Sequence, residues 1–295
     1  MEIIEDIIRN IEYFPDRPGA AYEILAQIDR PGTGMDDILK ILEYDIAVTT
    51  NILKFANSGM FGGCHNINSV KQALECIGIE PLKELITMSA STDIFAGGTG
   101  HTGYETGLGE LRRHSQAAAV ISRHLVPYIP SDSDGQIAAG LFTACLLHDV
   151  GKLILSRYVG EHDQKIKDLV SETHCDFAEA EKTVIGMTHA EVGARILEKW
   201  HFPGQLVTAA RYHHQPEAVP HHTLTHFVSL ANSIAMIIGY ATGIDAMGYK
   251  GFPALYRKYK LKEKDIEIIS MRAVDEIKAV TPFERRRKKR EVSKK

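Results

Sequence analysis

The residues of this chain most able to do chemistry are histidines that recur beside carboxylates. The sequence has 14 histidines, more than its 8 methionines or 11 prolines. Imidazole and carboxylate are ligands of divalent transition metals rather than of calcium, and such ions polarise phosphoryl oxygens and activate water. We predict a site for one or two ions, iron or manganese ahead of nickel or zinc. Its candidate ligands lie in four places: Glu110 with His114, His148 with Asp149, His189, and His213 with His214.

Two of these places lie on strongly patterned helices. His114 shares an apolar stripe with Leu111 and Ile121, and Glu110 precedes it at the four-residue spacing that brings two side chains onto one face. The segment LFTACLLHDVGK, 141 to 152, is an apolar helix that ends in His148 and Asp149 and holds Lys152 near them. Because an unpaired buried carboxylate is costly, this position favours pairing or metal coordination.

The other places are weaker when taken singly. Thr188 is a plausible N-cap for the helix that His189 opens. Taken alone, His189 is as readily a surface residue as a metal ligand, and His213 and His214 could form a polar turn. Three further histidines are near enough in sequence to replace a ligand, namely His221, His222 and His226.

Hydrophobic spacing predicts an all-α protein with no convincing strand. Six glycines between positions 97 and 109 indicate a linker, and no GK[ST] follows them to suggest a phosphate-binding loop. We therefore divide the chain into an N-terminal helical part (1–96), a glycine-rich linker (97–109), a helical part with the metal site (110–283) and a disordered basic tail (284–295). The predicted helices are 1–13, 38–55, 70–77, 81–89, 110–126, 136–157, 162–173, 176–185, 189–200, 204–213, 223–240 and 262–280.

Charge and targeting features narrow the partners and the compartment. The formal net charge of the chain is −4. The tail alone carries +6, so the remaining residues carry −10. An acidic body argues against nucleic-acid binding except through the tail. The four cysteines are scattered without a CxxC pair, which favours reduced thiols. The N-terminus has acidic residues among its apolar ones, which argues against a signal peptide. The most apolar run covers only positions 138–147, too short to span a membrane, so we predict a cytoplasmic protein.

The order His114, His148-Asp149, His189, His213-His214 resembles the HD superfamily of metal-dependent phosphohydrolases. Two further segments, DIAVTTNILKFANSGMFGG (45–63) and INSVKQALECIGIEPLKELI (67–86), resemble the HDOD family, a regulatory branch related to the HD-GYP phosphodiesterases. The resemblance covers about residues 4–245. It implies an all-helical fold in which an N-terminal helical bundle packs against HD-like helices.

Carried over position by position, the resemblance implies a ligand set and two departures from the enzymes. Glu110 and His114 match a Glu-xxx-His pair, and Lys152 completes an HDxGK motif. Asn232 stands where HD enzymes have the last aspartate ligand, so it would offer a neutral oxygen. The loop with the GYP signature is absent, and cyclic-dinucleotide recognition does not carry over. The metal ligands implied are Glu110, His114, His148, Asp149, His189, His213, His214 and Asn232.

Two functions fit this ligand set. The first, which Asn232 and the missing loop favour, is a signal-transduction module that binds metal structurally or as a sensor and engages a signalling protein. The second is a metal-dependent phosphohydrolase or phosphodiesterase. Its catalytic residues would be Asp149, which holds metal, and Lys152, which would contact a phosphate oxygen of a phosphate-containing small molecule.

Overall fold

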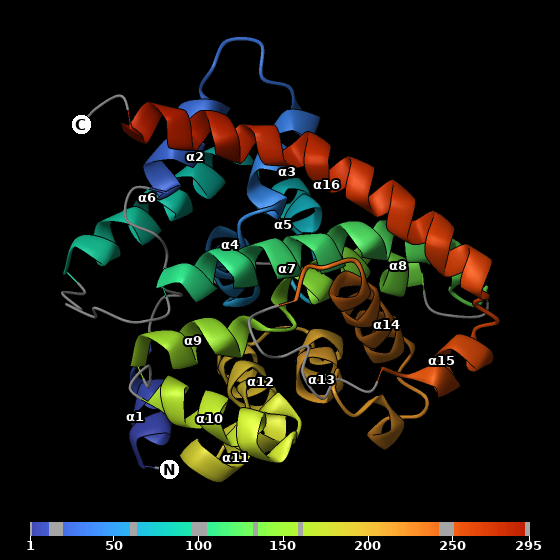
Figure 1. Ribbon diagram of the computed structural model, residues 1–295. Coiled ribbons are helices and arrows are strands. Elements are labelled where there is room, and N and C mark those ends of the chain that lie inside the picture. The colour runs from blue at the N-terminus through green and yellow to red at the C-terminus, as the bar shows by residue number, and fades with distance from the viewer. Residues whose placement is uncertain are drawn as a thin grey trace.

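A computed structural model describes residues 2–11, 20–59, 64–95, 105–131, 135–158, 162–241 and 251–292. Within these ranges the regular elements are helices, which confirms the predicted all-α class (Figure 1). Short 3-10 turns lie at Val126–Tyr128 and Pro216–Ala218. The α-helices are α1 (Glu2–Asn10), α2 (Ala20–Ile28), α3 (Met35–Glu43), α4 (Ile46–Asn57), α5 (Val70–Ile77), α6 (Ile79–Phe95), α7 (Glu105–Leu125), α8 (Gly135–Leu147), α9 (Val150–Tyr158), α10 (Asp163–Thr173), α11 (Phe177–Ile185), α12 (His189–Lys199), α13 (Gly204–Tyr212), α14 (Thr223–Ile237), α15 (Pro253–Lys258) and α16 (Glu263–Val292).

Helix α7 lies at the centre of the protein. It packs against α8, α14 and α16, and Figure 1 shows α16 above it, at an angle to it. A single cluster of buried apolar side chains includes Leu42 of α3, Ile121 of α7 and Phe227 of α14. The N-terminal helices therefore share a core with the helices that carry the candidate ligands. Whether the two predicted parts fold independently stays a prediction.

Asp45 corrects one predicted element. The spacing of apolar residues predicts a single helix over 38–55, but α3 ends at Glu43 and α4 begins at Ile46. The Asp45 carboxylate accepts hydrogen bonds from the backbone N–H groups of Ala47 and Val48, both at 3.1 Å. This cap satisfies donors that every helix start leaves open, so the chain begins a new helix here although the apolar pattern runs on.

The ends of two other predicted segments also change. Helix α7 begins at Glu105, so positions 105–109 of the predicted linker are helical, while 96–104 lie outside the described residues. Helix α16 continues to Val292, so the predicted disordered tail is helical as far as it is described. Glutamate, arginine and lysine are good helix formers, which accounts for this continuation. The short helices α2 and α15 were not predicted.

The prediction of reduced cysteines is wrong for one pair. Cys64 and Cys76 form a disulfide that joins the segment before α5 to the last turn of that helix. Cys145 is buried and Cys175 is half-buried, and both are free thiols. The pair is separated by 12 positions in sequence, which carries no recognisable signal.

One described segment, Ile137–Leu155, is apolar enough by length and composition to cross a membrane. It is 72% buried inside the protein, and the turn at His148 and Asp149 divides it into α8 and α9. These features are those of a core segment in a soluble protein. The predicted helix over 136–157 is accordingly two helices.

Two glycines set the distance between α9 and α12. A Cβ atom added at Gly151 would lie 1.9 Å from the carbonyl oxygen of His189, and one added at Gly193 would lie 3.0 Å from the backbone nitrogen of Gly151. No side chain fits between the helices at this crossing. Because Asp149 precedes α9 and His189 opens α12, this close approach brings the two candidate ligands together.

Replacing Gly151 with alanine should therefore disrupt the crossing. We expect Gly151→Ala to lower the free energy of unfolding in urea by about 3 kcal/mol, because the new methyl group meets backbone rather than a movable side chain. Gly204→Ala is the control, since no atom lies within 4 Å of a Cβ there. Its stability should be unchanged or raised by up to about 1 kcal/mol. Equal stabilities of the two variants would contradict this account of the crossing.

Candidate metal centre

Asp149 is shared by two groups of possible ligands. One group, here the three-histidine group, consists of Asp149, His189, His213 and His214. The other, the two-histidine group, consists of His114, His148 and Asp149. Within each group the ligand atoms lie within 4.8 Å of one another, and all these residues are buried except His214, which is half-buried.

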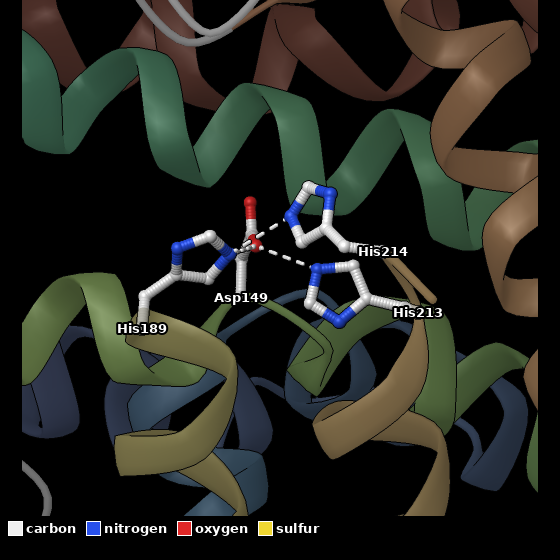
Figure 2. A group of neighbouring side chains, drawn as sticks. All are labelled: Asp149, His189, His213 and His214. Carbon is white, nitrogen blue, oxygen red and sulfur yellow. Dashed lines mark hydrogen bonds and ion pairs between the residues drawn. The ribbon is translucent and has the colours of Figure 1, made fainter. Parts of the chain in front are cut away.

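The three-histidine group surrounds one oxygen of the carboxylate. Oδ1 of Asp149 lies 3.2 Å from Nε2 of His189 and 3.4 Å from Nε2 of His213. Nε2 of His189 lies 3.0 Å from Nε2 of His214. Figure 2 shows the three rings directed at the carboxylate from α12 and from the end of α13.

The two-histidine group faces the other oxygen. Oδ2 of Asp149 lies 3.5 Å from Nε2 of His148 and 3.7 Å from Nε2 of His114, and these two nitrogens are 3.2 Å apart. Lys152, one turn after Asp149, donates a hydrogen bond from Nζ to the same oxygen at 2.8 Å. Lys152, the residue predicted to contact a substrate phosphate, is thus hydrogen-bonded to Asp149, a candidate metal ligand.

Backbone carbonyl groups hold three of the rings in one orientation. The Nδ1 atoms of His114, His148 and His213 lie 2.6 to 2.8 Å from the carbonyl oxygens of Tyr240, Cys145 and Ala210 respectively. A carbonyl oxygen only accepts, so each Nδ1 carries the proton and each neutral ring presents a lone pair at Nε2. Burial lowers the pKa of His114 and of His148 to about 4, which keeps both rings neutral and able to bind metal at pH 7.

His189 is held by Glu181, a residue that the sequence did not reveal as functional. One oxygen of Glu181 accepts from Nδ1 of His189 at 2.6 Å and from its backbone N–H at 2.8 Å, and Glu181 is only 2% exposed. Burial opposes the charged ring, but Glu181 and Asp149 outweigh it and raise the pKa of His189 to about 9. A carboxylate behind a metal-binding histidine is a common support for the ligand. The available signal was an acidic residue beside the apolar Ala180 on the face that α11 buries.

The donor set fits a divalent transition metal. Asp149 Oδ1, His213 Nε2 and Asn232 Oδ1 are buried and make no hydrogen bond. Two ligands bound to one ion at about 2.1 Å and at right or tetrahedral angles lie about 3.0 to 3.4 Å apart. The distances between neighbouring ligand atoms in the three-histidine group, 3.0 to 3.4 Å, fall within this range. Because its pKa is about 9, His189 carries a proton on Nε2 at pH 7, and an ion that binds here would displace that proton and be shared by the three rings and Asp149.

The structure brings together most of the predicted site residues but not all. Glu110 is half-buried on α7 and belongs to neither group. Asn232 is buried on α14, one turn after Ser229, whose hydroxyl donates to the carbonyl oxygen of His213 at 2.7 Å. This contact places the same stretch of α14 against the loop that carries His213. The residues predicted as replacements do not join the groups: His226 pairs with the Tyr259 hydroxyl at 2.7 Å, and His221 and His222 line a separate cavity.

Comparison with known proteins agrees with the fold. The HDOD domain profile matches residues 14–216. The structure is similar to an HDOD domain protein from Geobacter sulfurreducens, with a TM-score of 0.50 and 22% identity over 95% of this chain and 96% of that one. It is also similar to the MmoQ response regulator of Methylococcus capsulatus, with a TM-score of 0.63 and 20% identity over 88% and 99% of the two chains. An uncharacterised protein of Treponema pallidum (strain Nichols) is 22% identical over 220 residues, and this match spans 75% of the chain but only 40% of that relative.

The shifted histidine pKa values predict how the stability of the metal-free protein depends on pH. For His114 and His148 the folded pKa lies below the ordinary 6.5, so the unfolded chain binds more protons in acid and stability falls between pH 6.5 and 4. For His189 the folded pKa is higher, so its contribution is complete below pH 6.5 and is lost as pH rises towards 9. Stability should therefore be greatest near pH 6.5.

Urea unfolding with a chelator at pH 5, 6.5 and 8.5 tests this dependence. At pH 5 we expect the free energy of unfolding to fall by about 2 kcal/mol for each of His114 and His148. At pH 8.5 we expect it to fall by about 2 kcal/mol because of His189. Glu181→Gln should flatten the alkaline decline, because it removes the charge that raises the pKa of His189. The control is Glu217→Gln, since Glu217 is exposed. A stability that rises steadily from pH 6.5 to 8.5 would contradict the assignment.

Proposed function

The chain belongs to the HDOD family, and we propose on this premise that it is a regulatory protein whose buried histidine and aspartate residues bind a divalent transition metal. One observation carries the proposal: two sets of inward-facing Nε2 atoms share the Asp149 carboxylate. Iron or manganese fits a set of imidazole nitrogens and one carboxylate, and nickel or zinc would also be accepted. An ion in the three-histidine group would join the start of α9, α12 and the end of α13, and one in the two-histidine group would join α7 to the turn between α8 and α9.

Burial favours a structural or sensory ion over a catalytic one. His148 is 0% exposed and Asp149 is 2% exposed, so a phosphodiester would have to displace protein to reach the ligand atoms. Lys152, which would contact that phosphate in an enzyme, donates to Asp149 instead. An ion held here would stabilise one arrangement of the helices around it. A signalling protein that recognises the helical surface in that arrangement would then read the state of the site.

A second function, phosphoester hydrolysis, is favoured by the sharing of one carboxylate between two groups. When bound, a pair of ions would polarise a phosphoryl oxygen and lower the pKa of a coordinated water. His114, His148, His189, His213 and Asp149 would hold them, and Lys152 would have to release Asp149 to contact a phosphate oxygen. Asn232 would supply a neutral oxygen where the HD enzymes have an aspartate.

Metal content tests the proposal directly. Protein purified without chelator should contain near-stoichiometric transition metal by elemental analysis. Asp149→Asn should reduce the content to background, because it removes the only carboxylate common to both groups. His65→Ala is the control, since this exposed histidine lies outside the groups. Well-folded wild-type protein without metal, and unable to take it up, would refute metal binding.

Hydrolysis of a generic phosphodiester separates the two functions. We expect metal-loaded wild-type protein and His148→Ala to show the same background rate, because the ligand residues other than the half-buried His214 are buried in the protein. A wild-type rate at least about tenfold above that of His148→Ala, about 1.4 kcal/mol in the barrier, would instead identify this site as a catalyst.

A further inference from the structure

We propose that the two groups are unequal, and that Lys152 occupies the place of a second cation beside Asp149. The protein would then bind one ion in the three-histidine group far more tightly than any second ion. This inference rests on the proposed function, because it assumes that the site binds metal. It goes further by stating which residues receive the ion and which residue excludes another.

The three-histidine group is prepared for a cation. It offers three imidazole nitrogens and Oδ1 of Asp149, and that oxygen and Nε2 of His213 are buried without a hydrogen bond. The buried Glu181 carboxylate lies directly behind His189. Its negative charge would make the ring a better ligand and offset part of the charge of an ion.

The two-histidine group is already supplied with a positive charge. Its carboxylate oxygen, Oδ2 of Asp149, accepts from the Lys152 ammonium at 2.8 Å. Besides that oxygen this group has two imidazoles, one fewer than the three-histidine group. An ion there would share Oδ2 with a like charge in a site shielded from water, where repulsion between cations is weakly screened.

Lys152 is held in this place by its own helix. Its side chain is 10% exposed, and it lies one turn after Asp149, with its backbone N–H bonded to the Asp149 carbonyl oxygen at 2.9 Å. The ammonium also lies 5.8 Å from the centre of the Phe177 ring. A second ion would therefore require the ammonium to leave a buried position. Methionine would keep the length of the stem and remove the charge.

Titration of chelator-treated protein with Mn²⁺ tests the inference. We measure the ions retained after gel filtration and the electron paramagnetic resonance spectrum, which distinguishes an isolated Mn²⁺ from an exchange-coupled pair. Wild-type protein should retain one ion per chain with an isolated-ion spectrum, and Lys152→Met should retain two with a coupled spectrum. Lys182→Met is the matched control, because Lys182 pairs with Glu191 outside both groups. Lys152→Gln is a second neutral variant should Lys152→Met not fold.

Single ligand variants test which group receives the ion. His114→Ala should retain the one tight ion, whereas His189→Ala should lower its affinity at least about tenfold. The reverse pattern would overturn the inference. So would two equally tight ions in wild-type protein, or one ion in both wild type and Lys152→Met; in these cases metal binding itself stands. No retained Mn²⁺ in wild type or any variant would overturn the proposed function together with the inference.

Discussion

The arrangement of the whole site depends on one constraint, the buried negative charge of the Asp149 carboxylate. Burial alone would raise the pKa of Asp149, but the neighbouring His148 and Lys152 hold it well below its usual range, so the group is ionised. An ionised carboxylate without water needs donors or cations on all sides. Lys152 supplies one at Oδ2, and the protonated ring of His189 lies 3.2 Å from Oδ1. Removal of either partner would leave charge that the core cannot solvate.

The backbone positions these partners more than the side chains do. The contact of Gly151 with α12 fixes the distance from Asp149 to His189, and Thr188 begins α12 at that point with a capping box that includes Glu191. The carbonyl oxygens that orient the rings come from the ends or flanks of helices: Cys145 near the end of α8, Ala210 near the end of α13 and Tyr240 after α14. Helix ends carry carbonyl groups without intrahelical partners, so each can orient a ring at little cost.

Much of this could be predicted from sequence, for physical reasons. The helices follow from apolar spacing, and the ligands His148 and Asp149 were recognisable because polar residues end an otherwise apolar helix. Glu181 is harder to recognise, because its one sequence signal is its place beside the apolar Ala180, and a single acidic residue on a helix is taken as exposed until tertiary packing is known. The break at Asp45 was hidden because the apolar pattern continues across it. Glu110 has the right spacing from His114, but helical spacing says only that two residues share a face and not how far that face is covered.

The balance of buried charges around Asp149 limits how many divalent ions the site can hold. Near the site the buried carboxylates of Asp149 and Glu181 are partly offset by the Lys152 ammonium, which leaves little negative charge for divalent cations. The two carboxylates and the ammonium sum to −1, so one divalent ion would bring the net charge of this set to +1, whereas a pair would bring it to +3, which neutral imidazoles do not neutralise. An aspartate in place of Asn232 would add one negative charge on α14. The same ligand frame would thus compensate a second ion better with a carboxylate at this position than with the amide of Asn232.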